Sequence, residues 1–485
     1  MTYFTGKDLI EAGLAPGPAL GATLAQANAA SDRDTATAIV RHAVVQSQAA
    51  AAAKAARLDG LRPTPRDDPP GFAIHLTPQT EDEVENAAAV QATMQSLMRT
   101  PTLEAGAVMP DACPAGPKGT IPVGGVVAAR GAIHPGMHSA DICCSLFATA
   151  FKDVDPAEAL DAIHGVTHFG PGGRGDFEAD PPTEIIERMR ANPFFTEKAI
   201  GQAWGHFGTQ GDGNHFAYVG RSEGTGQVTL VTHHGSRGMG AQVYKAGMAV
   251  AERYRLDLSP ATQKQNAWIP FAAPEGPDYW DALQIVRDWT KANHAALHGA
   301  VARALGRDSA DRWWNEHNFV FRDPADGDLF WHAKGATPVE SGFLPDTDGR
   351  QIVPLNMAQP ILVVKGERTP HGLGFAPHGA GRNLSRTAHT KRLQAAMGAD
   401  YSEEAVFARE TQGIDARFFC GNIDVSELPS AYKDADAVTT EMARAGLARV
   451  TDRIQPFGAI MAGDWERDTP WRRKRAAKAA ARAAQ

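Results

Sequence analysis

Short β-like runs alternate with long helical runs over most of this chain, and the alternation limits the folds that it can adopt. Apolar runs typical of strands occur at residues 121–129, 146–151, 227–232, 318–321, 329–333 and 361–364. Helical patterns cover residues 81–98, 239–254, 279–305 and 437–454. Because the elements follow no constant period, a repeat array is excluded, and one large mixed α/β domain of the α+β class is predicted.

Two stretches of unusual composition bound this domain. Residues 1–57 have helical patterns, and four prolines between Leu61 and Gly71 end any regular element because proline lacks the N–H donor and fixes φ. We therefore predict a helical appendage and linker at 1–70, a main domain at 71–463 and a basic tail at 464–485. The cations of the tail are Arg472, Arg473, Lys474, Arg475, Lys478 and Arg482. Such a tail is typical of a solubilising terminus or of a segment that attracts phosphate backbones.

Composition excludes several classes of protein. The 485 residues are 43% hydrophobic and 21% charged, which is ordinary for a soluble globular protein. The net charge of −8 means that any nucleic-acid contact must come from a local basic patch. No apolar run approaches the roughly 18 residues of a membrane span, the first residues have no signal-peptide pattern, and four cysteines fit a reducing compartment. We expect a cytoplasmic monomer.

Four separate segments carry side chains typical of metal ligands. They contribute Asp141, Cys144, His215, His233 or His234, and His317. A single cysteine or histidine is more often a packed or hydrogen-bonded residue than a ligand. Together, however, one carboxylate, one thiolate and three imidazoles suit Mn²⁺, Zn²⁺ or Co²⁺ better than Mg²⁺ or Ca²⁺.

A glycine-rich stretch around His378 has the composition of a phosphate site. Two of the next three residues are glycines, which allow close backbone approach, and a helix beginning near Asn383 would bring Arg382 and Arg386 together. Free N–H groups at a helix start and bidentate arginines suit a phosphorylated ligand. The alternative is a glycine-rich turn capped by Ser385 with a solvated histidine.

These segments and several others resemble the motifs of the RtcB-type RNA-splicing ligases, in order and in approximate spacing. The matching segments lie at residues 108–116, 121–126, 141–144, 213–216, 233–240, 317–318, 334–337 and 378–382. The resemblance extends from about Val108 to Gly463. It implies the catalytic fold of that family for this part of the chain.

The resemblance also implies a mechanism of nucleotidyl transfer. In that family a histidine, matched here by His378, attacks the α-phosphorus of GTP and forms a histidine–GMP phosphoramidate. The guanylate passes to an RNA 3′-phosphate, and a 5′-hydroxyl end then displaces GMP; ends with a 2′,3′-cyclic phosphate are first hydrolysed. The family uses Mn²⁺, so the resemblance implies two Mn²⁺ ions, GTP as co-substrate and RNA as partner. The implied Mn²⁺ ligands are Asp141, Cys144, His215, His233 and His317.

Further binding residues follow from the same match. The implied nucleotide-binding residues are Asn214, His215, Phe216, Asn318, Pro354, Asn356, Met357, His378, Gly379, Ala380 and Gly381. The implied phosphate or RNA contacts are Arg237, Lys334, Arg382 and Arg386. We expect His233 rather than His234 to be the ligand, because neighbouring residues at a strand end point to opposite faces.

Several positions differ from the family pattern. Cys143 replaces an asparagine, Tyr218 stands where a guanine-reading glutamate is common, and Ala462 stands where a lysine touches the nucleotide. Residues 354–358 replace a glycine-containing loop. Tyrosine cannot accept hydrogen bonds from guanine N1–H and N2–H₂ as a carboxylate does. These differences predict a looser selection of GTP.

Three functions are compatible with these observations. The first is an RNA ligase that acts in RNA repair. The second is a metal-dependent nucleotidyltransferase or phosphoesterase of the same fold without ligation, which Tyr218 and Ala462 favour. The third is a non-catalytic RNA-binding protein that keeps the metal site for stability. Label transfer from α-labelled GTP separates the first from the third, and a two-fragment RNA substrate separates the first from the second.

Overall fold

The computed structural model describes residues 2–14, 17–57, 65–115, 121–344, 347–467 and 469–470. The chain forms two compact units, Met1–Leu61 and Arg62–Gln485. The division falls at the start of the proline-rich stretch. The predicted basic residues from Arg472 to Arg482 lie outside the described residues.

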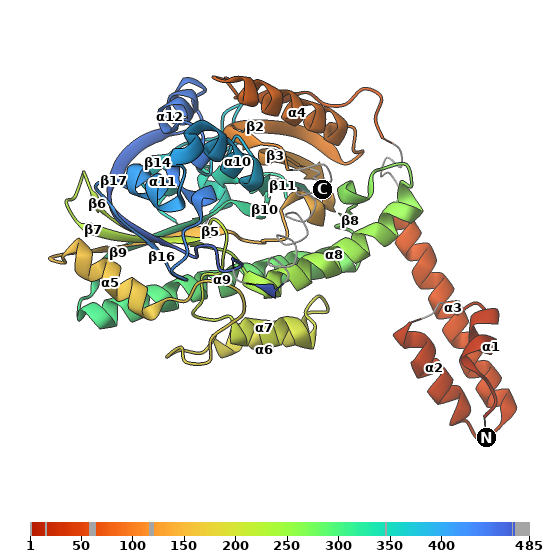
Figure 1. Ribbon diagram of the computed structural model, residues 1–485. Helices are drawn as coiled ribbons and strands as arrows, with labels where there is room; N and C mark the ends of the chain where they lie inside the picture. The colour runs from red at the N-terminus through yellow and green to blue at the C-terminus, as the bar shows by residue number, and fades with distance from the viewer. Residues whose placement is uncertain are drawn as a thin grey trace, which may run out of the picture. The chain divides into compact units, whose positions relative to one another are not determined.

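The described residues of the first unit form three helices. They are α1 (Gly6–Glu11), α2 (Pro18–Asn28) and α3 (Arg33–Arg57) (Figure 1). A capping box begins α1, because the Thr5 hydroxyl accepts the N–H of Asp8 and the Asp8 carboxylate accepts the N–H of Thr5. The helices share a small core of Leu9, Leu14, Ala27, Ala36 and Val40. They therefore bury an apolar face of their own.

The second unit contains two main sheets (Figure 1). The five-stranded sheet has, in spatial order, β1 (Phe72–Ile74), β2 (Leu103–Cys113), β3 (Val123–Arg130), β11 (Leu329–Lys334) and β10 (Asn318–Arg322). The eight-stranded sheet has the order β13 (Gln351–Val353), β14 (Ile361–Lys365), β17 (Arg449–Met461), β6 (Phe216–Ser222), β7 (Val228–His234), β5 (Ser145–Phe151) and β9 (Ser309–Glu316), with β16 (Asp415–Phe418) parallel to β17. Two short pairs join β12 (Ala336–Pro338) to β15 (Phe375–Pro377) and β4 (Ala132–Ile133) to β8 (Ile269–Pro270). This mixture of sheets and helices confirms the predicted α+β class.

Helices surround these sheets. They are α4 (Glu81–Met98), α5 (Pro156–Val166), α6 (Thr183–Ala191), α7 (Glu197–Gly205), α8 (Arg237–Leu258), α9 (Glu275–Leu305), α10 (Arg386–Met397), α11 (Glu403–Glu410) and α12 (Ala435–Arg444). Helices α6 and α7 pack on α9 and α8 rather than on a sheet. Helix α4 packs on β2 and β3 of the five-stranded sheet. Helices α5 and α9 pack on one face of the eight-stranded sheet, and α10 and α11 contribute to the core on its other face. Alternate residues of each central strand therefore face different cores.

Most of the predicted elements agree with these bounds, but the helix predicted at 437–454 is wrong. Helix α12 ends at Arg444, and β17 begins at Arg449. Gly446 ends the helix with a φ of 63°, and the N–H of Leu447 donates to the carbonyl of Met442. The following residues pair with β14 and β6, so sheet pairing overrides the helical spacing of their apolar side chains.

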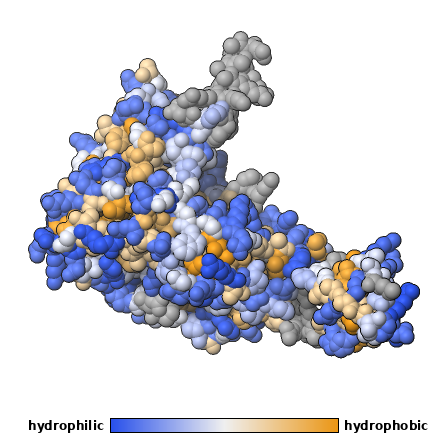
Figure 2. Space-filling view, turned by 90° about the horizontal axis from the view of Figure 1, so that it is seen from below, coloured by the Kyte–Doolittle hydropathy of each residue, from blue (hydrophilic) through white to orange (hydrophobic). Residues whose placement is uncertain are grey.

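Hydrophobic side chains lie mainly inside these cores. The face of the molecule in Figure 2 is largely hydrophilic, with small and separate hydrophobic patches. Among the described helices, none has the length and apolar character needed to cross a bilayer.

Candidate active site

Sheet order brings the five predicted metal ligands to one end of the eight-stranded sheet. Asp141 and Cys144 precede β5, His215 precedes β6, His233 is the last residue but one of β7, and His317 follows β9. The strands β6, β7, β5 and β9 are neighbours in that order. In antiparallel neighbours the start of one strand lies beside the end of the next. Segments far apart in sequence therefore meet at this end of the sheet.

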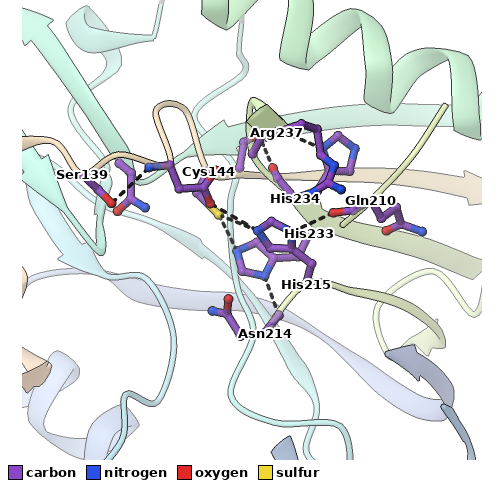
Figure 3. Close-up of polar contacts among 12 residues, drawn as sticks. Ser139, Cys144, Gln210, Asn214, His215, His233, His234 and Arg237 are labelled. Carbon is purple, nitrogen blue, oxygen red and sulfur yellow. Dashed lines mark hydrogen bonds and ion pairs between the residues drawn. The ribbon is translucent and has the colours of Figure 1, made fainter. Parts of the chain in front are cut away.

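The ligand atoms lie within reach of shared ions. Cys144 Sγ is 3.1 Å from His233 Nε2 and 3.7 Å from His215 Nε2 (Figure 3). His215 Nε2 lies 3.2 Å from Asp141 Oδ2, and His233 Nε2 lies 3.2 Å from His317 Nε2. Two overlapping groups result, Asp141 with Cys144 and His215, and Cys144 with His233 and His317, and in each group the ligand atoms lie within 4.8 Å of one another. Cys144 belongs to both groups.

Backbone carbonyls fix two of the imidazole rings in an orientation suited to metal binding. The Nδ1 atom of His215 lies 2.7 Å from the carbonyl oxygen of Gln210, and Nδ1 of His233 lies 3.1 Å from that of Asn214 (Figure 3). A carbonyl oxygen only accepts, so each Nδ1 carries the proton and each Nε2 directs its lone pair at the cluster. This arrangement is typical of metal-bound histidines.

The protonation states of these groups also suit divalent ions. Burial lowers the pKa of His233 to about 3 and lowers that of His317 well below its usual value, so both rings are neutral near pH 7. Burial opposes the ionisation of Asp141, but its hydrogen bond with His215 lowers the carboxyl pKa overall. Burial raises the pKa of the Cys144 thiol, which must lose its proton to become a ligand. The residues therefore fit a borderline divalent ion.

His234 points away from this cluster. Its ring stacks on that of His294, with centroids 3.4 Å apart, and its Nε2 lies 3.4 Å from Nδ2 of Asn293. Figure 3 likewise shows the sulfur of Cys144 toward His215 and His233 rather than toward His234. His233, and not its neighbour, therefore belongs to a group of side chains that could hold a metal ion.

His378 lies beside the cluster and is held by a buried carboxylate. Its ring centroid is 5.0 Å from that of His317. Its Nδ1 lies 2.5 Å from Oδ2 of Asp111, which also accepts the backbone N–H groups of His378 and Gly379. Asp111 is fully buried. Since Nδ1 is occupied, Nε2 is the ring nitrogen left for chemistry.

Sequence reasoning did not single out Asp111. It lies in the segment 108–116 that carries part of the family resemblance, but no spacing relates it to His378, 267 residues away. The position of an acid inside an otherwise apolar run was the available signal.

A cavity of about 840 Å³ opens onto His378 and His233. Most of the residues predicted to bind a nucleotide line it, namely Asn214, Phe216, Pro354, Asn356, Met357, His378, Gly379, Ala380 and Gly381. His215 lies in the ligand cluster, and Asn318 lies outside the lining, where its side-chain oxygen accepts the N–H of Gly335 at 2.7 Å. The cavity is large enough to hold a small-molecule ligand.

Of the four predicted phosphate contacts, Arg382 and Arg386 line the cavity, and both pair with Glu427. The helix begins at Arg386, with Ser385 as its cap, rather than near Asn383. Arg382 therefore lies outside the helix, because the Ser385 hydroxyl already satisfies the N–H of Ala388 and fixes the start. The two arginines are brought together by a shared carboxylate instead of by helical spacing.

The other two cations lie outside the cavity lining. Arg237 donates to the hydroxyl of Thr209 and to the carbonyl of Gly170. Lys334 lies 3.4 Å from the carbonyl oxygen of Ile121, and burial lowers its pKa. Neither hydrogen-bonds to a carboxylate in the contacts that the described residues make; burial lowers the pKa of Arg237, and the nearby Asp212 and Asp141 partly oppose this shift.

The three positions that depart from the family pattern have different surroundings. Tyr218 lines the cavity, and its hydroxyl donates to the carbonyl of Ile454 at 2.8 Å. Ala462 is buried in the core on the opposite face of β17 from Met461. Cys143 is buried, with a φ of 57°, and does not belong to either group of ligand atoms among the described residues.

Comparison with known proteins identifies the family. The family model described as tRNA-splicing ligase RtcB matches residues 177–462, which is more than half of the chain. The chain belongs to the RtcB family. This confirms the relationship that the sequence motifs predicted.

Several RtcB proteins are similar to the chain at modest identity. The tRNA-splicing ligase RtcB of Methanopyrus kandleri is 26% identical over 315 residues, covering 55% of this chain and 31% of that protein. The RNA-splicing ligase RtcB of Mycobacterium bovis is 28% identical over 303 residues, covering 55% and 67%. The tRNA-splicing ligase RtcB of Archaeoglobus fulgidus is 28% identical over 308 residues, covering 54% and 61%. The chain thus spans about a third of the first of these RtcB proteins and about two thirds of the others.

Proposed function

We propose that this chain is a GTP- and Mn²⁺-dependent RNA ligase that acts in RNA repair. It would join 3′-phosphate or 2′,3′-cyclic-phosphate ends to 5′-hydroxyl ends through a histidine–GMP intermediate on His378. The observation that carries this proposal is the position of His378, which is held by Asp111, faces the ligand cluster and lines the large cavity. The names of the RtcB relatives support RNA as the substrate.

The His378–Asp111 pair provides an oriented nucleophile. Asp111 accepts the Nδ1 proton, which leaves the lone pair of Nε2 free to attack the α-phosphorus. As the Nε2–P bond forms, the bond between the α-phosphorus and its bridging oxygen breaks, and pyrophosphate leaves. The ring becomes positively charged, and the buried carboxylate at 2.5 Å stabilises that charge.

Two ion sites would be held by the five ligand residues, with Cys144 shared between them. Mn²⁺ bound there would neutralise phosphate charge as a Lewis acid. Arg382 and Arg386 lie on the cavity wall with their side chains held by Glu427, so both are positioned to contact phosphate oxygens. Arg237 and Lys334 add positive charge for the RNA ends.

Transfer of label to the protein tests the proposal. The chain is incubated with α-labelled GTP and Mn²⁺ and then separated on a denaturing gel, and we expect an acid-labile adduct that disappears in His378→Ala. The exposed His371 provides the matched control, and His371→Ala should keep the adduct. Absence of any adduct contradicts the proposal.

RNA joining is tested separately. Two RNA fragments, one ending in a 3′-phosphate and the other beginning with a 5′-hydroxyl, should be joined in the presence of GTP and Mn²⁺. An adduct without joining would favour the nucleotidyltransferase that lacks ligation, which the replaced residues Tyr218 and Ala462 also favour.

A further inference from the structure

The floor of the cavity is an apolar part of the eight-stranded sheet. It is formed by Phe216 and Tyr218 of β6, Ala459 and Met461 of β17, and Ile361 of β14. Phe216 pairs with Met461, and Tyr218 pairs with Ala459. Because side chains alternate along a strand, these four lie on one face, and the intervening Ala217 and Ile460 belong to the core on the other face.

This floor lies at the distance from the cluster where a base would bind. Strand β6 begins directly after His215, and Tyr218 is three residues further on, so at about 3.3 Å per residue it lies about 10 Å along the strand from that ligand. If the proposed function holds and Nε2 of His378 meets the α-phosphorus, the base lies one ribose away from the cluster. The base therefore rests on the apolar floor.

No free carboxylate faces this floor in the part of the chain that the structure describes. The Tyr218 hydroxyl has a single proton, which it donates to the carbonyl of Ile454 at 2.8 Å. Glu427 is the one carboxylate among the described lining residues. Its Oε1 pairs with Arg386 at 2.5 Å, and its Oε2 accepts from Tyr432 at 2.6 Å and lies 3.4 Å from Arg382. Both oxygens therefore already face cationic or donating partners, and the contact of Oε1 among the described residues is its ion pair with Arg386.

We propose that this cavity accepts adenine as well as guanine, so that ATP is a second nucleotide donor to His378. Guanine presents the N1–H and N2–H₂ donors together with O6, and burying such groups without partners costs free energy. Adenine presents fewer polar groups to an apolar floor. A site built to hydrogen-bond one base rejects analogues by a factor of about 10⁴ or more, whereas an apolar site discriminates by no more than about 200-fold.

The reaction with ATP forms and breaks the same bonds as the reaction with GTP. Nε2 of His378 bonds to the α-phosphorus, the bond from that phosphorus to the bridging oxygen breaks, and pyrophosphate leaves. The product is a histidine–AMP phosphoramidate with Nδ1–H still held by Asp111.

The deciding experiment compares nucleotides on the wild-type chain. Initial rates of adduct formation are measured with α-labelled ATP and with α-labelled GTP, each with Mn²⁺, and kcat/KM is obtained for both. We expect kcat/KM for GTP to exceed that for ATP by less than about 200-fold, and a larger preference for GTP overturns the inference. An adduct from GTP alone leaves the proposed function standing, whereas no adduct from either nucleotide contradicts the proposed function.

Two variants of Tyr218 test whether the cavity floor sets the selectivity between GTP and ATP. Tyr218→Glu supplies the missing acceptor and should raise the ratio of the GTP rate to the ATP rate by at least about 10-fold. Tyr218→Phe removes a hydroxyl already committed to Ile454, so this ratio should stay at the wild-type value even if both rates fall. A folded Tyr218→Glu variant with an unchanged ratio places the base elsewhere and overturns the inference. If that variant does not fold, the wild-type comparison decides.

His378→Ala identifies the residue that takes the nucleotide. It should form no adduct from ATP, because the same Nε2 attacks both donors. An ATP-derived adduct that persists in this variant shows nucleotidylation at another residue and overturns the inference.

Discussion

At the scale of single residues, Asp111 gives His378 properties that a solvated histidine lacks. One oxygen of this buried carboxylate contacts the ring nitrogen and two backbone N–H groups of the same turn. The ring can therefore neither flip nor present Nδ1 to a ligand. A fixed imidazole with one exposed nitrogen is what nucleophilic catalysis at phosphorus requires.

The neighbouring histidines His233 and His234 provide a test of the ligand cluster. We expect His233→Ala to lose at least one bound divalent ion per chain, because its Nε2 lies 3.1 Å from Cys144 Sγ. His234→Ala should retain its ions, since that ring stacks on His294 away from the cluster. Elemental analysis of the purified variants after loading with Mn²⁺ measures the difference. The reverse result would mean that β7 has the opposite register.

Residue types that bind metal could be recognised from the sequence, but their surroundings could not. The five ligand residues stand out because of their chemistry, and all but His215 lie beside a predicted strand; β6, which follows His215, was not predicted. The pairing of Arg382 and Arg386 with Glu427 could not be predicted, because no local pattern relates an acid some forty residues away. Similarly, only the structure shows that the Tyr218 hydroxyl bonds to Ile454.

At the scale of elements, the sequence predicted a helix correctly where capping residues and apolar spacing agree. It predicted a helix wrongly where strand pairing overrides the apolar spacing. The helix predicted at 81–98 agrees with α4. Thr80 caps its start by accepting the N–H of Glu83, and three acidic residues stand in its first turn, so local chemistry and apolar spacing agree. The segment 437–454 instead contains a helix end, a turn and the start of β17. Its apolar residues fit helical spacing, but β6 and β14 provide backbone partners that only tertiary structure reveals.

The backbone conformation of Gly446 should end α12 before β17 begins. Its φ is 63°, and no atom lies within 4 Å of the position that a Cβ would take. Gly446→Ala should therefore lower the free energy of unfolding by about 1 kcal/mol through conformational strain alone. Urea unfolding followed by circular dichroism measures this change.

Gly165, inside α5, is the matched control for this prediction. A Cβ at that position also meets no atom within 4 Å, and its backbone is helical. Gly165→Ala should keep or raise the free energy of unfolding, by up to about 1 kcal/mol. Equal losses in the two variants would show that strain at Gly446 is not the cause.

At the scale of the whole second unit, the site depends on elements from both main sheets. Asp111 and Cys113 come from β2 of the five-stranded sheet, and Tyr218 comes from β6 of the eight-stranded sheet. The cavity is lined by Cys113 as well as Tyr218, so it lies where the two sheets approach each other. Contacts between residues so distant in sequence exist only after the unit has folded, which is why the motifs predicted the components of the site but not its shape.

Buried histidines outside the ligand cluster should make the stability of this unit depend on pH. Burial lowers the pKa of His134 to about 3, of His138 to about 4 and of His298 to about 3, from an ordinary value of 6.5. The unfolded chain therefore binds more protons than the folded chain as the pH falls below 6.5. The contribution of these histidines to stability is therefore fully present above pH 6.5. It is lost as the pH falls toward their pKa values in the folded chain.

Between pH 7 and pH 5 each of these histidines should remove about 2 kcal/mol from the free energy of unfolding. Urea unfolding at the two pH values measures the total. His298→Gln should reduce the pH dependence, because glutamine does not titrate and can still bond to Thr149 and Thr232, which now contact the two ring nitrogens at 2.7 and 2.8 Å. A pH dependence as steep as that of the wild-type chain would mean that His298 is not one of the groups that take up a proton on unfolding.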